Sequence, residues 1–145
     1  MSIKQMCVYL FACLVAMCGC IGYILYDLNC THGVYEINIS AVCLSNDSVG
    51  NEWIKTYEMD GDIITSGKRI TAPLDSKIEK TVNIIIIEKD KRSDRSEKGI
   101  DIVIEDKERV TSTLTVVENN GRFKGNRAVW QIDISVCLNK RILYK

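Results

Sequence analysis

After residue 33 the chain alternates apolar and polar residues along most of its length, which is the pattern of half-buried β-strands. In residues 34–44 the apolar face consists of Tyr35, Ile37, Ile39, Ala41 and Cys43. In residues 128–138 the apolar face consists of Trp130, Ile132, Ile134, Val136 and Leu138. Each pattern predicts a strand with one face in a core and the other in solvent.

Shorter apolar runs between these two predict further strands at 53–59, 63–64, 70–74, 81–87, 100–104 and 110–117. The dipeptides at 60–61 and 120–121, Asp-Gly and Asn-Gly, are hairpin signals, because both central residues of a type I′ turn need positive φ. The run at 81–87 is apolar on both faces near its end, which predicts a central strand. Pro73, the only proline, suits an edge strand or a loop. Seven or eight such strands without an amphipathic helix predict an all-β antiparallel sandwich over residues 34–145, such as the Ig-like fold.

Residues 6–26 form a stretch of 21 residues without a charge. A helix of that length spans about 30 Å, the thickness of the hydrocarbon layer of a bilayer. The stretch therefore predicts an uncleaved transmembrane signal-anchor. The positive-inside rule places Lys4 and residues 1–5 in the cytoplasm. Residues 27–33 would then be a linker, with the sandwich outside.

Two other interpretations of the N-terminal stretch stay open. A cleaved signal peptide would release a secreted domain, although such peptides have shorter apolar runs. A lipoprotein signal would place a lipid on Cys20, although Met17 and Cys18 fit that motif poorly. In either case the sandwich would still lie outside the cytoplasm.

Of the seven cysteines, only Cys30, Cys43 and Cys137 follow the apolar stretch. In an oxidising compartment these three predict one disulfide and one free thiol. A Cys43–Cys137 bond would tie the first strand to the last. The alternation places Cys137 on the polar face of its strand, which argues against that bond unless a bulge intervenes.

Composition excludes several classes of function. Acidic and basic residues balance at 19 each, which gives no electrostatic case for nucleic acid. The single histidine, His32, lies in the linker and has no second ligand partner for zinc. The sequence contains no phosphate loop and no nucleophile elbow. The chain is therefore expected to be a binding protein rather than an enzyme, with no obligate cofactor.

Residues 88–99 carry five basic and four acidic groups. Calcium takes several oxygen ligands converging from loops. Candidate ligands are the carboxylates of Asp47, Glu88, Asp90 and Asp94. Two alternatives remain: a solvated hairpin tip of mixed charge, or a basic contact with lipid headgroups or an acidic partner.

The two loops resemble those of the C2 domain, a calcium- and lipid-binding β-sandwich. The order of residues in the first loop is similar: Ala41, Leu44, Asp47, Gly50 and Trp53. In the second, two acids one residue apart are followed by a further acid and a glycine: Glu88, Asp90, Asp94 or Glu97, and Gly99. The sequence departs from the family where Asn51-Glu52-Trp53-Ile54 replaces the usual Ser-Asp-Pro-Tyr and where Glu88 replaces an aspartate. The resemblance covers about residues 34–104 and implies a C2-like sandwich that binds Ca²⁺ and then lipid or protein.

Three functions follow as hypotheses. The first is a membrane-anchored extracytoplasmic binding or interaction module whose partner is a protein. The second is a calcium-dependent C2-like binder of lipid or protein. The third is a structural, envelope-associated subunit that acts through an edge strand, with the region of Pro73 as the candidate edge.

Overall fold

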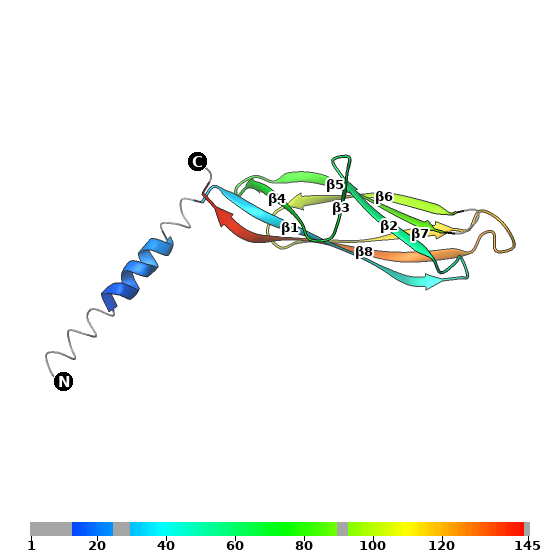
Figure 1. Ribbon diagram of the computed structural model, residues 1–145, viewed down its shortest axis with the longest axis horizontal. Helices are drawn as coiled ribbons and strands as arrows, with labels where there is room; N and C mark the ends of the chain where they lie inside the picture. The colour runs from blue at the N-terminus through cyan, green and yellow to red at the C-terminus, as the bar shows by residue number, and fades with distance from the viewer. Residues whose placement is uncertain (1–12, 25–29, 90–92, 144–145) are drawn as a thin grey trace, which may run out of the picture.

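The computed structural model describes residues 13–24, 30–89 and 93–143. The chain from residue 30 onward forms a long, narrow sandwich of two four-stranded antiparallel sheets (Figure 1). The prediction of an all-β antiparallel sandwich is therefore confirmed. The strands are β1 (His32–Asn46), β2 (Trp53–Met59), β3 (Asp62–Ile64), β4 (Lys68–Pro73), β5 (Ile78–Glu88), β6 (Arg95–Ile104), β7 (Glu108–Val117) and β8 (Arg127–Ile142).

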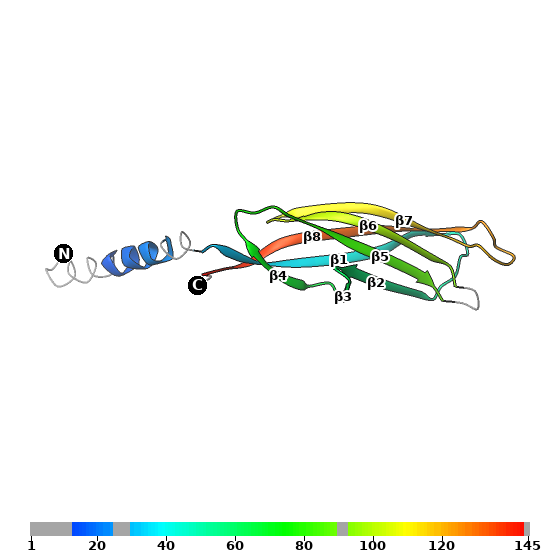
Figure 2. The ribbon, with the colours of Figure 1, turned by 90° about the horizontal axis from the view of Figure 1, so that it is seen from above.

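The first sheet has the order β4-β1-β8-β7 and the second has the order β3-β2-β5-β6. The longest strands, β1 and β8, pair side by side from His32 opposite Ile142 to Asn46 opposite Ala128. Both ends of the sandwich domain therefore lie at the same end of its long axis (Figures 1 and 2). Pro73 lies in β4, at the edge of its sheet, as its missing N–H requires.

The core lies between the sheets and is built from the inward-facing residues of each strand. Its fully buried side chains are mostly aliphatic and include Ile37, Ile84, Ile86, Ile102, Ile104, Ile132, Ile134, Val82, Val116 and Val136. Burial of each such side chain stabilises the folded protein by about 1.5–3 kcal/mol relative to leaving the side chain exposed to water. The ring centroids of Trp53 and Trp130 lie 5.2 Å apart in an edge-to-face arrangement, with Trp130 in the core and Trp53 packed against it.

The N-terminal stretch is helical over residues 13–24. No helix in the described part of the chain has both the length and the apolar character needed to cross a bilayer. The other residues of the expected anchor at 6–26 lie outside the described residues.

The expected disulfide between Cys43 and Cys137 is wrong, because both thiols are free and exposed. The register explains why. Cys137 lies opposite Glu36 and Cys43 lies opposite Trp130, so the two cysteines are about seven residues apart along neighbouring strands. That offset corresponds to roughly 20 Å, far beyond the Cα separation of about 7 Å that a disulfide allows.

The charged stretch at 88–99 is not a hairpin tip throughout. Strand β6 begins at Arg95, where it pairs with Ile87 of β5, and it continues through Gly99 opposite Asn83. The ladder with β5 keeps this charged segment extended although its sequence lacks apolar alternation. Strand β5 itself lies between β2 and β6, as predicted for a central strand.

Candidate functional site

Three loops gather at the end of the sandwich opposite His32 and Ile142 (Figure 1). They connect β1 to β2, β5 to β6 and β7 to β8. We call them the distal loops: residues 47–52, 89–94 and 118–126, of which 90–92 lie outside the described residues. A partner that approaches the domain along its long axis, away from the chain ends, would meet these loops first.

Hydrogen bonds join the distal loops to their neighbours. The amide of Asp47 donates to Arg127 O at 2.9 Å, which connects the first loop to the start of β8. The amide of Lys89 donates to Glu52 O at 2.7 Å, which connects the first and second loops. These bonds hold the backbone of two loops and β8 in one arrangement.

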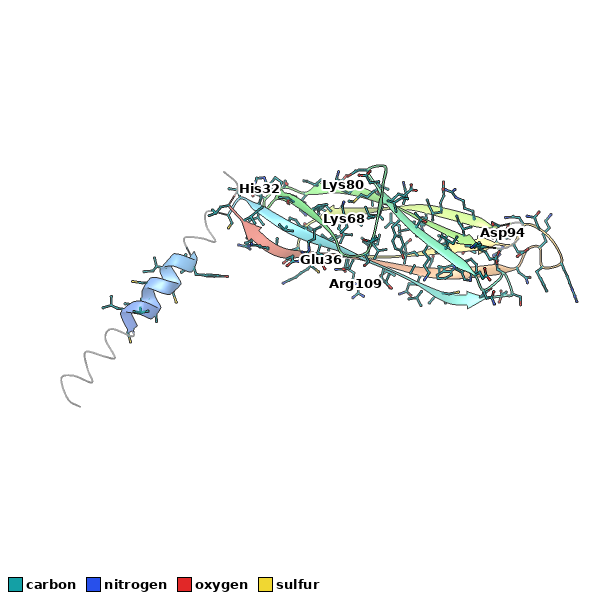
Figure 3. The ribbon with its side chains drawn as sticks, viewed as in Figure 1. His32, Glu36, Lys68, Lys80, Asp94 and Arg109 are labelled. Atoms are coloured by element: carbon teal, nitrogen blue, oxygen red, sulfur yellow. The ribbon has the colours of Figure 1, made fainter. Side chains whose placement is uncertain are left out.

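Asp94 joins the second loop to the third. Its side chain is 2% exposed, and Oδ1 accepts hydrogen bonds of 3.0 Å from both the backbone N–H and Nδ2 of Asn119. Figure 3 labels Asp94 at this end of the molecule. Its second oxygen, Oδ2, is buried and accepts no hydrogen bond from the residues that the structure describes. A buried carboxylate oxygen in this state is costly unless a further group satisfies it.

Glu88 is buried at the end of β5, with 3% of its surface exposed, and its carboxylate lies directly against Gly50 of the first loop. Gly50 has φ +146°, a conformation that favours glycine. A Cβ at this position would collide with Glu88 Oε1. The side chain of Asn46 completes the turn, because its Oδ1 accepts from Val49 N at 2.9 Å. The first loop is thus shaped to let the Glu88 carboxylate lie beneath it.

The structure places the predicted calcium ligands in different environments. Asp47 is exposed in the first loop, whereas Glu88 and Asp94 are buried at the base of the second. Asp90 lies outside the described residues. Among the residues described, no three carboxylate, histidine or cysteine side chains are arranged to hold a metal ion. The calcium site therefore stays a prediction.

Phe123 is a candidate contact residue that the sequence analysis did not identify. It is 49% exposed at the tip of the third loop, and the Arg122 guanidinium lies 5.8 Å from its ring centre. The loop is held by bonds from Glu118 N to Asn126 O at 3.0 Å and from Asn126 N to Phe123 O at 2.9 Å. The available signal was an aromatic residue in the polar, glycine-rich stretch at 119–126.

The outer face of the β4-β1-β8-β7 sheet is polar and carries two carboxylates with perturbed pKa values. A hydrogen bond from Arg69 Nε at 3.1 Å holds the pKa of Glu36 below its usual range. Hydrogen bonds from Thr111 at 2.6 Å and Gln131 at 2.8 Å do the same for Asp133. Both acids are therefore ionised partners in a hydrogen-bonded surface and are poor proton donors or acceptors at neutral pH.

His32 is the first residue of β1 and lies at the opposite end from the distal loops (Figure 3). Its Nδ1 lies 3.0 Å from the hydroxyl oxygen of Thr31.

No family model, curated protein or solved structure matches this chain. Its function therefore has to be inferred from its own residues.

Proposed function

We propose that the chain is a membrane-anchored, extracytoplasmic β-sandwich that binds a protein partner through its distal loops. The charge-free stretch at 6–26 supports the anchor. The pairing of His32 with Ile142 supports the orientation, because it places both ends of the sandwich at the end nearest that stretch in the chain. The distal loops then lie at the end farthest from the anchor.

The observation that carries the binding proposal is the exposed ring of Phe123 in a loop held by hydrogen bonds. Aromatic residues and arginine, the types of Phe123 and Arg122, are enriched at protein interfaces. A loop whose backbone is already held loses little conformational entropy when a partner binds. The hydrogen bonds between the buried Asp94 and Asn119 supply that order to the third loop.

The location is tested with Cys137, whose free thiol is exposed on the sandwich. In cells that produce the full chain, a membrane-impermeant maleimide should label Cys137 without lysis. The background chain should carry Cys43→Ala and alanine at every cysteine before residue 30, and the same chain with Cys137→Ala is the control. Labelling only after lysis would contradict an extracytoplasmic domain. Release of the labelled protein from the membrane fraction would favour a cleaved signal peptide over the anchor.

A second candidate is calcium-dependent binding, which Asp94 favours. Its Oδ2 is buried without a donor from the described residues, and a cation would satisfy it. Thermal unfolding of the full chain in detergent, with millimolar Ca²⁺ and with a chelator, tests this function. Ligand at 100 times its dissociation constant adds about 2.7 kcal/mol, enough to raise the midpoint by several degrees. Equal midpoints in both conditions would exclude it.

A third candidate is a structural subunit that assembles through an edge strand. The position of β4, with Pro73, at the edge of its sheet favours this function. A stable complex that co-purifies without calcium and is lost on Thr71→Pro, which alters β4, would support it. A complex that survives this change would not involve β4.

A further inference from the structure

Half of strand β1 has a neighbouring strand on one side only. Strand β4 pairs with β1 from His32 to Ile37, whereas β8 pairs with β1 over its whole length. The turn between β3 and β4 covers two more positions, because Gly67 N donates to Ile37 O at 2.8 Å and Ile39 N donates to Ser66 Oγ at 2.9 Å. Beyond Ile39 the β4 side of β1 is open.

The open edge presents a specific set of backbone groups. Alternate residues of a strand direct their N–H and C=O to the same side. Since Ile37 and Ile39 direct theirs to the β4 side, Ala41 and Cys43 do so as well. Ala41 O accepts a hydrogen bond of 3.0 Å from Lys55 Nζ, which reaches across from β2. No described residue pairs with Ala41 N–H or with the backbone groups of Cys43 on this side.

The open segment also lacks the usual protection of an edge strand. Residues 40–46 carry no charge, and Val42 is 53% exposed on the outer face. Natural edges are normally blocked by charged side chains, prolines or covering loops. Here the one basic group is Lys55, which belongs to another strand and is held by a single hydrogen bond to β1 and by the ring of Trp130 at 4.8 Å.

We propose that a second copy of the chain pairs with this edge, antiparallel, with the two-fold axis at Val42. Ala41 of each copy then lies opposite Cys43 of the other. In that register the N–H and C=O of both residues form four hydrogen bonds between the copies, after Lys55 releases Ala41 O. Val42 meets Val42 of the second copy in a non-hydrogen-bonded pair, where cross-strand side chains are closest.

This self-complementarity is the reason that the partner of the open edge is a second copy of the chain. A two-fold axis at Val42 satisfies every open backbone group of Ala41 and Cys43 in both copies, and the uncharged segment does not repel its own copy. The register shift between Cys43 and Ser45 limits regular pairing to the residues before it. The interface is therefore short, and we expect the association to be weak. The N-terminal segments leave such a dimer at opposite ends.

This proposal goes beyond the proposed function and does not depend on where the sandwich lies in the cell. Its test is a disulfide formed by Val42→Cys in the full chain, in detergent, with every other cysteine except the buried Cys30 changed to alanine. Residues opposite each other in a non-hydrogen-bonded pair have Cα atoms about 4.5 Å apart, which a disulfide can bridge. Mild oxidation should produce a covalent dimer on a non-reducing gel.

Ser40→Cys is the matched control, because residue 40 is exposed on the same face of β1. In the proposed register the two copies of residue 40 are about four positions apart, or roughly 13 Å, so this variant should stay monomeric. Ala41→Pro, added to Val42→Cys, removes an N–H that the single chain does not use and should abolish the covalent dimer while the thermal midpoint is retained.

Three outcomes would overturn the proposal. The first is equal disulfide formation by Val42→Cys and Ser40→Cys, which would indicate random collision. The second is a covalent dimer that survives Ala41→Pro in a folded protein. The third is the absence of a dimer with Val42→Cys, including the case in which this cysteine forms a disulfide only with a different protein.

Discussion

Asp94 and Asn119 lie in different loops and are joined through one carboxylate oxygen, which accepts from both the backbone N–H and the side-chain amide of Asn119 at 3.0 Å. The Asp94 side of the contact is buried, and the contact connects the loop between β5 and β6 to the loop between β7 and β8. It therefore positions the third distal loop, which carries Phe123, relative to the sheet that contains β5.

Replacing Asp94 by alanine should destabilise the domain by about 2–3 kcal/mol, because two part-buried hydrogen bonds to a carboxylate are lost and the Asn119 backbone N–H loses its acceptor, while Nδ2 keeps its hydrogen bond to Val117 O. Asp101→Ala is the control, since Asp101 is exposed in β6, the strand that follows Asp94, and accepts one hydrogen bond from Thr81 at 2.6 Å. Urea unfolding should show a much smaller change for the control. Equal losses of unfolding free energy in the two variants would show that the contact between Asp94 and Asn119 stabilises the domain no more than an exposed hydrogen bond does.

The close approach of Gly50 to Glu88 predicts that Gly50→Ala is more harmful than an equivalent change at another left-handed glycine. Gly61 has φ +84° with open space around the position of a Cβ, so Gly61→Ala measures the conformational cost alone, about 1 kcal/mol. Gly50→Ala adds a collision with the Glu88 carboxylate and should cost about 1–3 kcal/mol more. Thermal unfolding of both variants tests this difference, and similar midpoints would contradict the contact.

The hydrogen bonds to Asp133 predict a dependence of stability on pH. The hydrogen bond from Thr111 is the main reason that the pKa of Asp133 lies below its ordinary value of 3.8 in the folded protein. Between the two pKa values the unfolded chain binds more protons, so the stabilisation is present above about pH 3.8 and is lost as the pH falls through the folded value.

Thr111→Val should therefore raise the pKa of Asp133 toward 3.8, as measured by an NMR titration of its carboxyl carbon. Thr115→Val is the control, because Thr115 is exposed on the same strand and lies opposite Val129 rather than an acid. A pKa of Asp133 that is the same in the wild type and in Thr111→Val would show that the hydroxyl does not hold the charge.

Much of the fold follows from the sequence, because most strands carry their own apolar alternation. The predicted strand at 53–59 matches β2, and the turn signal at Asp60 and Gly61 is correct, with φ +55° and +84°. Strand β6 was predicted too short, since Arg95 to Lys98 are kept extended by pairing with β5 rather than by their own pattern. Pairing between distant segments supplies order that local composition does not show.

The candidate site was less predictable. The sequence placed Asp47, Glu88 and Asp94 in loops of similar character, and only packing shows that two of them are buried and one is exposed. The buried Asp94 is hydrogen-bonded to Asn119, which lies 25 residues away in the chain. The free edge of β1 could not be predicted from the sequence either, because it arises where β4 stops pairing with β1. Such features depend on contacts between segments, which periodicity cannot reveal.

The central claim is that the distal loops of a membrane-held sandwich contact a protein partner. The most direct measurement replaces Phe123 with a photo-reactive phenylalanine analogue in intact cells and compares it with the same change at Ile63. Ile63 is 74% exposed in β3, on the side of the sandwich, and is the matched control. We predict a covalent adduct of one defined added mass from position 123 and none from position 63. An adduct from position 63 alone, or from neither position, would contradict the claim.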